Sequence, residues 1–330
     1  MTLRIGLNGF GRIGKNFARL AIRDPDVELV AFNARKSASA YAYTFKYDSV
    51  HGNWPGEVRA EDDGIVVDGM KIKMTTDARG EWQWGKLGVD VVVEATGLFV
   101  DRESCQMHLD RGAKKVIVSA PGKEPDLTVV YNVNHQEYDP DKHNIISVAS
   151  CTTNCLAPVA MALHKEFGVQ KAFMSTMHAY TTSQALLDST NSKDPRRGRA
   201  AALNLVPTTT GAAKAVGLVL PELEGKIDGL AIRSPNPNGS IVDLTAVVEK
   251  ATSRDEVNAL FQRLQNETLG YTDEFLVSED IIGDSHGCVI DGQSTGVMEG
   301  NLVKVLAWYD NEMGFNHQML RMLKHVGSSL

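Results

Sequence analysis

Two cysteines four residues apart are the part of this sequence best suited to covalent chemistry. Cys151 and Cys155 lie in ASCTTNC, residues 149–155, and the chain has only four cysteines. A zinc site commonly takes four Cys or His ligands in two close pairs, and the remaining Cys105 and Cys288 have no such spacing. A disulfide within one helical turn has poor geometry. Two buried thiols or one activated thiol remain as the alternatives.

A helix that begins at the first of these cysteines would activate it. The strand-like stretch 144–150 leads into a stretch with apolar residues at helical spacing, and Ser150 is a natural N-cap. Backbone N–H groups and the helix dipole favour a thiolate at Cys151, whereas Cys155 lies one turn deeper and is expected to be structural. A nucleophilic cysteine also needs a base. His178, at the end of a strand-like stretch, is the best-placed candidate, with a core histidine as the equal alternative.

A glycine-rich turn near the N-terminus predicts a dinucleotide site. Gly9, Gly11 and Gly14 have G-x-G-x-x-G spacing between an apolar stretch, 3–9, and a helical pattern, 12–24. Such glycines permit a tight turn, close approach of the backbone to a pyrophosphate, and close packing of helix on strand. An ordinary glycine-rich turn is the alternative, but the strand–turn–helix context favours the dinucleotide.

The end of the next strand bears on which dinucleotide binds. NAD-binding folds place an acid about 20 residues after the glycines to hold the ribose 2′-hydroxyl, and that position is Ala34. Arg35, Lys36 and Ser37 follow directly. A carboxylate would repel a 2′-phosphate, whereas Arg or Lys would pair with one, so the stretch favours NADP over NAD. Solvated turn residues beside an NAD site without its carboxylate are the alternative.

Three further stretches have groups that bind phosphate. One is a charged loop, 193–199, one is a hydroxyl-rich stretch with Gly211 where a helix is expected to begin, and one is Arg233 at a strand end. The loop contributes Lys193, Arg196, Arg197 and Arg199. Each stretch alone has an ordinary structural explanation. Together with a reactive thiol and a dinucleotide fold, they favour a phosphorylated substrate.

Length and composition fit a soluble protein of two domains. The chain has 330 residues, of which 43% are hydrophobic and 23% charged, and this length exceeds what one core usually holds. No apolar run reaches the ~18 residues of a membrane span, and the N-terminus lacks the pattern of a secretory signal. Few cysteines without a disulfide framework indicate a cytoplasmic location. A net charge of -7 argues against nucleic-acid binding.

The order of apolar stretches predicts an α/β fold. Strand-like stretches alternate with helical ones in the first 150 residues, and 89–97 is nearly continuous in valine, as in a strand covered on both faces. These features predict a doubly wound parallel (Rossmann-type) sheet. Later stretches alternate apolar with polar residues, which predicts an α+β catalytic domain with a mostly antiparallel sheet. We expect a dinucleotide-binding domain of residues 1–150 and 312–330 and a catalytic domain of residues 151–311.

Seven stretches of the sequence together resemble the phosphorylating glyceraldehyde-3-phosphate dehydrogenase family. They are NGFGRIG, KYDSVHG, EATGLF, GAKKVIVSAP, ASCTTNCLAP, PTTTGAAKAVGLVLPEL and AWYDNE. The resemblance runs from residue 2 to the C-terminal helix, and the cysteine and YDNE motifs are its most specific parts.

The resemblance implies oxidative phosphorylation of glyceraldehyde 3-phosphate to 1,3-bisphosphoglycerate, and the reverse reaction. In that family the cysteine matching Cys151 attacks the aldehyde to form a hemithioacetal, and the histidine matching His178 acts as base and steadies the charge that develops on oxygen. Hydride passes to NADP or NAD, and inorganic phosphate cleaves the resulting thioester. This chemistry suits a thiol, because a thioester keeps the oxidation energy available to phosphate.

The same resemblance implies the remaining site residues. Thr181 and Arg233 would hold the substrate phosphate, and Arg197 would lie between that site and the site of the attacking phosphate. The attacking phosphate would bind Ser150, Thr152, Thr210 and Gly211. The residues implied at the cofactor are Gly9, Gly11, Arg12, Ile13, Gly14, Asn33, Arg35, Ser37, Thr96, Gly97, Ser119 and Asn311. The family is homotetrameric, with the loop 183–211 reaching a neighbour's cofactor site.

The sequence departs from the family pattern at several positions. The usual Asp of the second strand is Ala34, and DSTNSKD lacks a proline common in NAD-dependent members, so both changes favour NADP. The departures near the active site are Val148, Asn236, Gly239 and Phe315. They bear on substrate range and rate.

Two other functions compete with this one. Erythrose-4-phosphate dehydrogenase, a close relative that releases a free acid, is favoured by DGQST at 291–295 and by Phe315, whereas Thr181 and TTTGAA favour the phosphorylating enzyme. A non-catalytic binding protein on the same scaffold is the other alternative. The intact Cys151 and His178 argue against it, because a pure binding role needs no reactive thiol.

Overall fold

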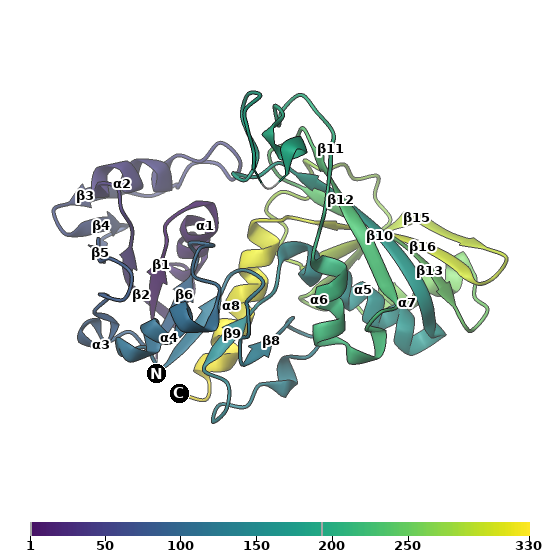
Figure 1. Cartoon of the computed structure of the whole chain (residues 1–330), viewed down its shortest axis with the longest axis horizontal. Coiled ribbons are helices and arrows are strands. Elements are labelled where there is room, and N and C mark those ends of the chain that lie inside the picture. The colour runs from purple at the N-terminus through teal and green to yellow at the C-terminus, as the bar shows by residue number, and fades with distance from the viewer. Residues whose placement is uncertain (1, 193) are drawn as a thin grey trace. The chain divides into compact units, whose positions relative to one another are not determined.

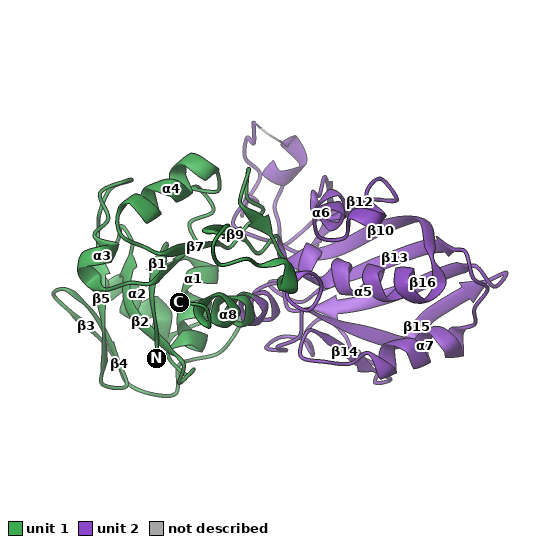
Figure 2. Cartoon of the chain, turned by 90° about the horizontal axis from the view of Figure 1, so that it is seen from below, with its two compact units in different colours: residues 1–129, 135–149, 319–330 green, residues 130–134, 150–318 purple. Residues whose placement is uncertain are grey.

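The chain folds into two compact units, each with its own sheet. The structure, a computed structural model, describes residues 2–192 and 194–330, so Lys193 lies outside the described residues. Unit 1 comprises residues 1–129, 135–149 and 319–330, and unit 2 comprises residues 130–134 and 150–318 (Figure 2). Within the described part of the chain, no helix is long and apolar enough to cross a membrane.

Unit 1 is built on a nine-stranded sheet in the order β3-β4-β5-β2-β1-β6-β7-β9-β8 (Figure 1). Its strands are β1 (Leu3–Asn8), β2 (Val27–Asn33), β3 (Val58–Glu61), β4 (Gly64–Val67), β5 (Met70–Thr75), β6 (Val91–Glu94), β7 (Lys115–Val118), β8 (Leu127–Thr128) and β9 (Ile145–Ser147). Its helices are α1 (Arg12–Ala21), α2 (Ala38–Lys46), α3 (Trp84–Leu87), α4 (Arg102–Asp110), the turn η1 (His135–Glu137) and the end of α8 (Met313–Gly327).

The strands of unit 1 are mostly parallel, as the sequence predicts. Strands β5, β2, β1, β6, β7 and β9 pair in parallel. All four residues of β6 and of β7 are buried, which accounts for their valine-rich sequences. The antiparallel pairs β3/β4 and β4/β5 were not predicted, because β3 and β5 are largely exposed and lack a continuous apolar run.

The turn between β1 and α1 requires glycine for two different reasons. Gly9 has φ +98°, and a Cβ there would lie 2.8 Å from the backbone of Ala95. A Cβ on Gly14 would lie 2.2 Å from the carbonyl oxygen of Gly9, so Gly14 permits the close packing of α1 on the turn. A Cβ on Gly11 would meet nothing within 4 Å. The open space at Gly11, at the N-terminus of α1, is therefore free for a ligand.

Unit 2 is built on a seven-stranded sheet in the order β11-β12-β10-β13-β16-β15-β14. Its strands are β10 (Val169–Ala179), β11 (Val206–Thr208), β12 (Ile227–Ser234), β13 (Ser240–Val248), β14 (Leu269–Thr272), β15 (Cys288–Met298) and β16 (Leu302–Tyr309). Its helices are α5 (Cys151–Phe167), α6 (Ala212–Val219), α7 (Arg254–Arg263), the turns η2 (Pro195–Gly198) and η3 (Pro221–Leu223), and the start of α8. The β10/β12 and β14/β15 pairs are parallel and the other pairs are antiparallel, so the sheet is mostly antiparallel.

Helix α5 packs on this sheet and carries the cysteine pair. It contacts β10, β13, β15 and β16, and most of its residues are buried. Pro158 lies inside the helix and cannot donate to the carbonyl of Asn154. Gly287 approaches that carbonyl so closely that a Cβ there would lie 3.1 Å from its oxygen. Helix α5 therefore lacks one backbone hydrogen bond at the point where the backbone of Gly287, just before β15, packs closely against it.

Candidate active site

The start of α5 has the geometry that the sequence predicts. Ser150 is the N-cap, and its hydroxyl oxygen accepts a hydrogen bond from the backbone N–H of Thr153 at 3.1 Å. Cys151 is the first helical residue. The preceding Ala149 has φ +55°, a left-handed conformation that is costly for a residue with a side chain. This strained turn directs the chain from β9 into the helix.

Three side chains of unit 2 form a continuous group around this thiol. The Cys151 Sγ lies 3.3 Å from Nε2 of His178. Strands β10 and β12 pair in parallel with His178 opposite Arg233, and the Arg233 Nη1 lies 2.6 Å from Nδ1 of His178. The same Nη1 donates to the carbonyl oxygen of Ala179 at 3.0 Å. Residues from a helix and two strands therefore meet in the order thiol, imidazole, guanidinium.

Two neighbours compete for Nδ1 of His178. The carbonyl oxygen of Ala179, 2.7 Å from Nδ1, can only accept a hydrogen bond, whereas Nη1 of Arg233, at 2.6 Å, can only donate one. With the ring proton on Nδ1, the ring donates to Ala179, and Nε2 faces the Cys151 sulfur as an acceptor, as a base for the thiol requires. With the ring proton on Nε2, Nδ1 accepts from Arg233 and Nε2 donates toward the sulfur.

Burial dominates the proton affinities of this group. Burial raises the pKa of the Cys151 thiol, and the nearby Arg233 opposes part of that rise. Burial, and then the charge of Arg233, lower the pKa of His178 to about 3. Backbone hydrogen bonds at the start of α5 lower the pKa of Cys151, in the direction expected from the sequence, but burial outweighs them. The histidine is neutral throughout the physiological range.

Tyr309 supports the group from inside the sheet. Its hydroxyl lies 3.0 Å from the Thr152 hydroxyl and 2.8 Å from the Thr176 hydroxyl. Its ring meets the His178 ring edge-on, with centroids 6.0 Å apart. Burial raises the pKa of Tyr309, so its hydroxyl stays protonated. The sequence analysis missed this residue, although it belongs to the AWYDNE motif.

The expected anion-binding residues lie on three surrounding segments. Arg197, in η2, donates from Nε to the Thr208 hydroxyl at 2.9 Å, and Asp194 is 3.5 Å away. Arg197 is close enough to Arg233 to contribute to lowering the pKa of Arg233, after burial. The Thr181 hydroxyl, past the end of β10, lies 3.0 Å from that of Ser183.

The two remaining anion-binding residues lie at the start of α6. The Thr210 hydroxyl oxygen accepts from the backbone N–H of Ala212 at 3.2 Å. Gly211 is the N-cap of α6, and a Cβ there would meet nothing within 4 Å. Helix α6 packs against α5, the helix that begins at Cys151. The open space at Gly211 is suited to an anion at a helix N-terminus.

Asn311 follows β16 in the same unit and is buried. Its amide oxygen accepts a hydrogen bond from the Ser240 hydroxyl at 2.7 Å, and that hydroxyl oxygen accepts from the backbone N–H of Ala179 at 3.1 Å. Ser240 thus holds the oxygen end of the amide beside the end of β10. The NH₂ end remains for a ligand.

Unit 1 contains a cavity of about 510 Å³ at the carboxyl ends of its parallel strands. Five of the expected cofactor residues line it: Gly9, Gly11, Asn33, Arg35 and Thr96. Gly97 and Ser119 are not among the described residues that line it, and Ser119 instead donates to the backbone oxygen of Glu94 at 2.9 Å. The glycine turn, an open helix N-terminus and strand-end polar groups fit a dinucleotide.

The remaining expected cofactor residues have structural partners nearby. Arg12 pairs with Asp48, and Ile13 is half-buried in α1. Ser37 is the N-cap of α2 and accepts from the backbone N–H of Ala40 at 3.3 Å. Ser37 lines a second hollow, next to Lys36, beside the cavity.

Comparison with known proteins decides the family. A family model described as "Glyceraldehyde 3-phosphate dehydrogenase, C-terminal domain" matches residues 150–311, and one described as "Glyceraldehyde 3-phosphate dehydrogenase, NAD binding domain" matches residues 3–102. The chain belongs to the glyceraldehyde-3-phosphate dehydrogenase family. This membership confirms the resemblance and the fold class predicted from the sequence.

Bacterial members of the family match along their whole length. The glyceraldehyde-3-phosphate dehydrogenase of Mycobacterium leprae is 50% identical over 343 residues, which covers 100% of both chains. That of Geobacillus stearothermophilus is 48% identical over 333 residues, or 99% of each chain. That of Streptomyces coelicolor is 46% identical over 337 residues, or 100% of each.

Two departures from the family pattern are explained by one turn. The amide of Asn236 donates to the carbonyl oxygens of Asn238 and Gly239, both at 2.7 Å. Gly239 has φ +81°, and a Cβ there would lie 2.1 Å from the carbonyl oxygen of Ser278. The Asn236 side chain and the glycine at position 239 therefore stabilise the same turn. Nothing in the structure explains Val148 or Phe315 beyond their burial.

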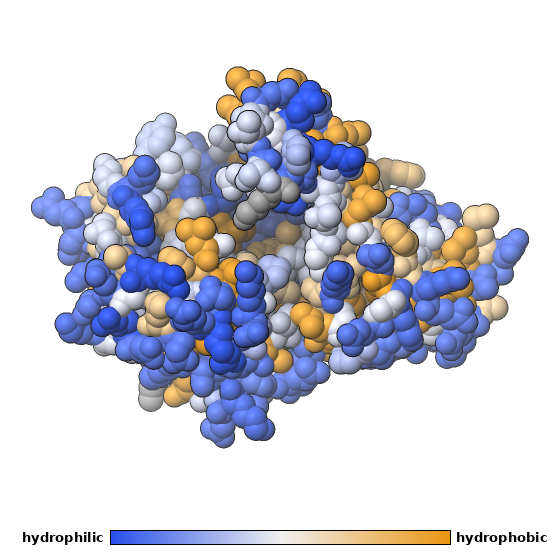
Figure 3. All heavy atoms as spheres, in the orientation of Figure 1, coloured by the Kyte–Doolittle hydropathy of each residue, from blue (hydrophilic) through white to orange (hydrophobic). Residues whose placement is uncertain are grey.

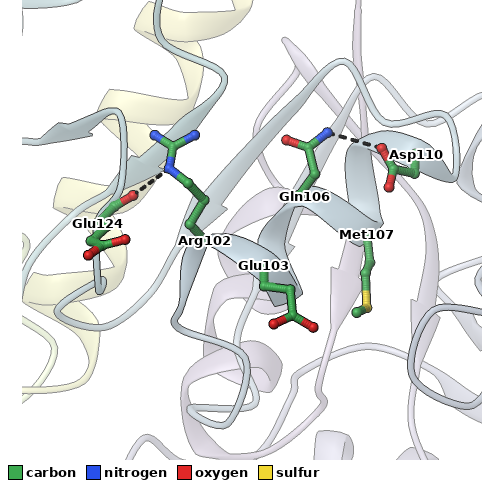
Figure 4. A pocket seen from close by; sticks show the side chains of 6 residues that line it. All are labelled: Arg102, Glu103, Gln106, Met107, Asp110 and Glu124. Atoms are coloured by element: carbon green, nitrogen blue, oxygen red, sulfur yellow. Dashed lines mark hydrogen bonds between the residues drawn. The ribbon is translucent and has the colours of Figure 1, made fainter.

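A separate hollow along α4 is a poor candidate for phosphate. Figure 4 shows its acidic lining and the hydrogen bond from Nε of Arg102 to the carbonyl oxygen of Glu124, at 3.0 Å. Arg102 also pairs with Asp126, and Gln106 donates to Asp110 at 3.0 Å. The one cation in the lining is thus already engaged.

We predict that replacing Arg233 by methionine moves the pH midpoint of Cys151 alkylation upward by about one unit. Arg233 is the charge that opposes the burial-induced rise in the Cys151 pKa, and a charge within a few ångströms typically shifts a pKa by one unit or more. The rate of reaction with iodoacetamide, mapped by mass spectrometry, measures the midpoint. The matched control is Arg263→Met, which removes an exposed arginine paired with Glu166. An unchanged or lower midpoint in Arg233→Met would contradict the prediction.

Proposed function

We propose that this chain is a phosphorylating glyceraldehyde-3-phosphate dehydrogenase that uses Cys151 as its nucleophile. One observation carries the proposal. The Cys151 sulfur lies 3.3 Å from Nε2 of His178, whose other nitrogen lies within hydrogen-bond distance of Arg233 and of the Ala179 carbonyl oxygen. A binding protein on this scaffold would gain nothing from a half-buried thiol aligned with an imidazole and a guanidinium. Family membership supplies the substrate, glyceraldehyde 3-phosphate.

The geometry supports the following course of reaction. As the Cys151 sulfur adds to the aldehyde carbon, its proton passes to Nε2 of His178, whose Nδ1 proton is held by the Ala179 carbonyl oxygen. The carbonyl electron pair moves onto oxygen, which accepts a hydrogen bond from the new Nε2–H. When bound, the dinucleotide supplies the acceptor for the hydride. Loss of the hydride from carbon and re-formation of the carbonyl leave a thioester on Cys151. An oxygen of inorganic phosphate then attacks the thioester carbon, the phosphate hydroxyl proton is released, the C–S bond breaks, and the leaving sulfur takes its proton back from His178.

Two phosphate positions fit the residues around the thiol. We assign the substrate phosphate to Thr181 and Arg233, and the attacking phosphate to Ser150, Thr152, Thr210 and Gly211. Arg197 serves both, since its guanidinium is held near Arg233 by Thr208. The buried hydroxyl of Tyr309 supports this assignment, because it fixes the Thr152 side chain at 3.0 Å.

We propose NADP as the preferred cofactor in the unit 1 cavity. Ala34 lines the cavity where a carboxylate would hold a ribose 2′-hydroxyl. The Tyr41 hydroxyl oxygen accepts from the backbone N–H groups of Arg35 and Lys36, both at 3.2 Å, so the turn is held in place. The Arg35 side chain is exposed and has no ion-pair partner among the described residues. It is therefore available to a 2′-phosphate.

Carboxylates near this position weaken the NADP preference without abolishing it. Asp62, Asp63 and Asp77 line the hollow beside Lys36 and Ser37. Lys71 lies 2.9 Å from Asp63, which compensates one of these charges. We expect the balance to favour a 2′-phosphate.

The purified enzyme is expected to use NADP better than NAD at equal concentration. The variant Ala34→Asp places a carboxylate in the cavity and is expected to lower kcat/KM for NADP about tenfold, with a smaller effect for NAD, because it repels the 2′-phosphate. Arg35→Gln is expected to lower kcat/KM for NADP alone. Initial rates with both dinucleotides measure the preference. A wild-type preference above tenfold for NAD would overturn the proposal.

Omitting inorganic phosphate is expected to stop sustained formation of reduced cofactor from glyceraldehyde 3-phosphate, because the thioester then has no acceptor. Cys151→Ser is expected to abolish turnover while keeping dinucleotide binding, and Cys155→Ala in the same helix serves as the control that keeps turnover. Full-rate turnover without phosphate would identify an acid-forming enzyme, as in erythrose-4-phosphate dehydrogenase. Activity retained by Cys151→Ser would remove the thiol from the mechanism.

We further propose a homotetramer in a reducing, cytoplasmic compartment. The four cysteines are free, as a reactive thiol requires. Four leucines on the segment before β11, Leu186, Leu187, Leu203 and Leu205, are exposed. Apolar atoms gather over this segment at the top of Figure 3. An exposed patch of this kind indicates a protein–protein contact.

Sedimentation velocity is expected to give a tetramer for the wild-type chain. Leu203→Asp is expected to shift it toward smaller species, because a carboxylate would be buried in the contact. Leu330→Asp, at the exposed C-terminus, is the control and should leave the tetramer intact. A wild-type monomer would refute the assembly.

A further inference from the structure

A row of polar side chains crosses the carboxyl edge of the unit 1 sheet. Thr75, Asn33, Asn8 and Glu94 are the last residues of β5, β2, β1 and β6. The strand register places each directly beside the next. Asn8 and Asn33 line the cofactor cavity, whereas Glu94 lies behind it. The row therefore connects the cavity to a residue that does not border it.

Every hydrogen bond along the row points toward Glu94. The Thr75 hydroxyl donates to Oδ1 of Asn33 at 2.9 Å, and the Asn33 amide donates to Oδ1 of Asn8 at 2.9 Å. The Asn8 amide donates to Oε2 of Glu94 at 2.6 Å. Each amide thus has its oxygen toward β5 and its NH₂ toward β6. The Asn33 amide also donates to the carbonyl oxygen of Asp77 at 3.2 Å, whereas the orientation of the Asn8 amide depends on the acceptor at the end of the row.

A second chain of donors reaches the same carboxylate from α4. The indole N–H of Trp84 donates to Nδ1 of His108 at 3.0 Å. An indole only donates, so Nδ1 is unprotonated and the ring proton lies on Nε2. The Nε2 is 3.2 Å from Oε2 of Glu94. His108 therefore accepts from Trp84 at Nδ1 and donates from Nε2 to Glu94.

The other oxygen of Glu94 holds the turn that lines the cavity. Oε1 accepts from the backbone N–H of Thr96 at 2.8 Å and from its hydroxyl. The Thr96 hydroxyl oxygen in turn accepts from the backbone N–H of Leu98 at 3.1 Å. Both Glu94 oxygens thus act as acceptors in each of these hydrogen bonds. The Glu94 side chain is 0% exposed, and it has no cationic partner among the described residues.

We propose that Glu94 is a positioning residue for the dinucleotide. Burying a carboxyl group away from water is costly. We explain its place in the structure by what it orients: the Asn8 amide and, through it, the Asn33 amide on one side, and the Thr96–Leu98 turn on the other. The proposal rests on the cofactor site proposed above. It assigns Glu94 to cofactor affinity and not to the chemistry at Cys151.

The test replaces the carboxylate by its amide, Glu94→Gln. Either orientation of the new amide places an NH₂ group against existing donors, those of Asn8 and His108 or the backbone N–H of Thr96. The Kd and KM for the preferred dinucleotide are expected to rise at least about tenfold, while kcat at saturating cofactor and KM for the aldehyde stay within about twofold. Tryptophan fluorescence reports Kd, since Trp82 lines the cavity. Glu57→Gln, a 70% exposed carboxylate in the same unit, is the matched control and should change nothing.

A milder variant covers the case in which Glu94→Gln does not fold. Thr75→Val removes the hydroxyl at the far end of the row and is expected to raise Kd about threefold. In the double variant the two effects are expected to be less than multiplicative, because both act through the Asn33–Asn8 amides. A Glu94→Gln protein with unchanged Kd, or with kcat and both KM values impaired alike, would overturn the proposal. A wild-type chain that binds neither NAD nor NADP would overturn the cofactor site itself and this proposal with it.

Discussion

The hydrogen bond from Arg233 to Nδ1 of His178 is the interaction on which the catalytic group depends. It exists because parallel pairing of β10 and β12 places the two residues opposite each other. It holds the imidazole ring with Nε2 3.3 Å from the sulfur of Cys151. Burial, and then the charge of Arg233, lower the pKa of His178 and keep the imidazole neutral. One cross-strand pair thus contributes to the position of the ring, the charge of the histidine and the electrostatic support of the sulfur.

Both units place a histidine beside partners with fixed hydrogen-bonding roles. In unit 2 Nδ1 of His178 contacts the Ala179 carbonyl oxygen, which only accepts, and Arg233, which only donates. In unit 1 the donors of two side-chain chains are aimed at Glu94, and the Trp84 indole, which only donates, leaves the His108 ring proton on Nε2. Burial raises the free-energy cost of disturbing either arrangement, because a buried donor that loses its acceptor cannot form a hydrogen bond with water instead.

Local sequence rules predicted much of this architecture, and their limits are physical. The N-cap at Ser150, the helix start at Cys151 and the valine-rich β6 follow from patterns within a few residues. The Tyr309 bridge between Thr152 and Thr176 could not be predicted in this way, because it joins residues more than 100 positions apart.

Protonation is the property that sequence predicts least. The helix N-terminus at Cys151 suggested a lowered thiol pKa, but the helix effect is worth about 1 kcal/mol, and the loss of hydration around the thiol outweighs it. The short antiparallel strands β3 and β5 were missed for the opposite reason, because their exposure leaves no apolar signature. The burial of a residue depends on the whole fold. The local sequence predicts it only where apolar residues form a clear run or a clear alternation.

Chemistry and cofactor choice are determined in different environments. His178 and Tyr309 are buried beside the half-buried Cys151, and removing one partner there leaves another polar group unsatisfied, at a cost of about 1–3 kcal/mol. Arg35 and Lys36 are exposed, and exposed ion pairs contribute about 1 kcal/mol or less each. Discrimination between NADP and NAD at this turn must therefore come from several weak electrostatic interactions, including those of the acidic residues beside Lys36. A few substitutions should therefore suffice to change the cofactor preference. The thiol chemistry is harder to change, because its side chains are hydrogen-bonded to one another.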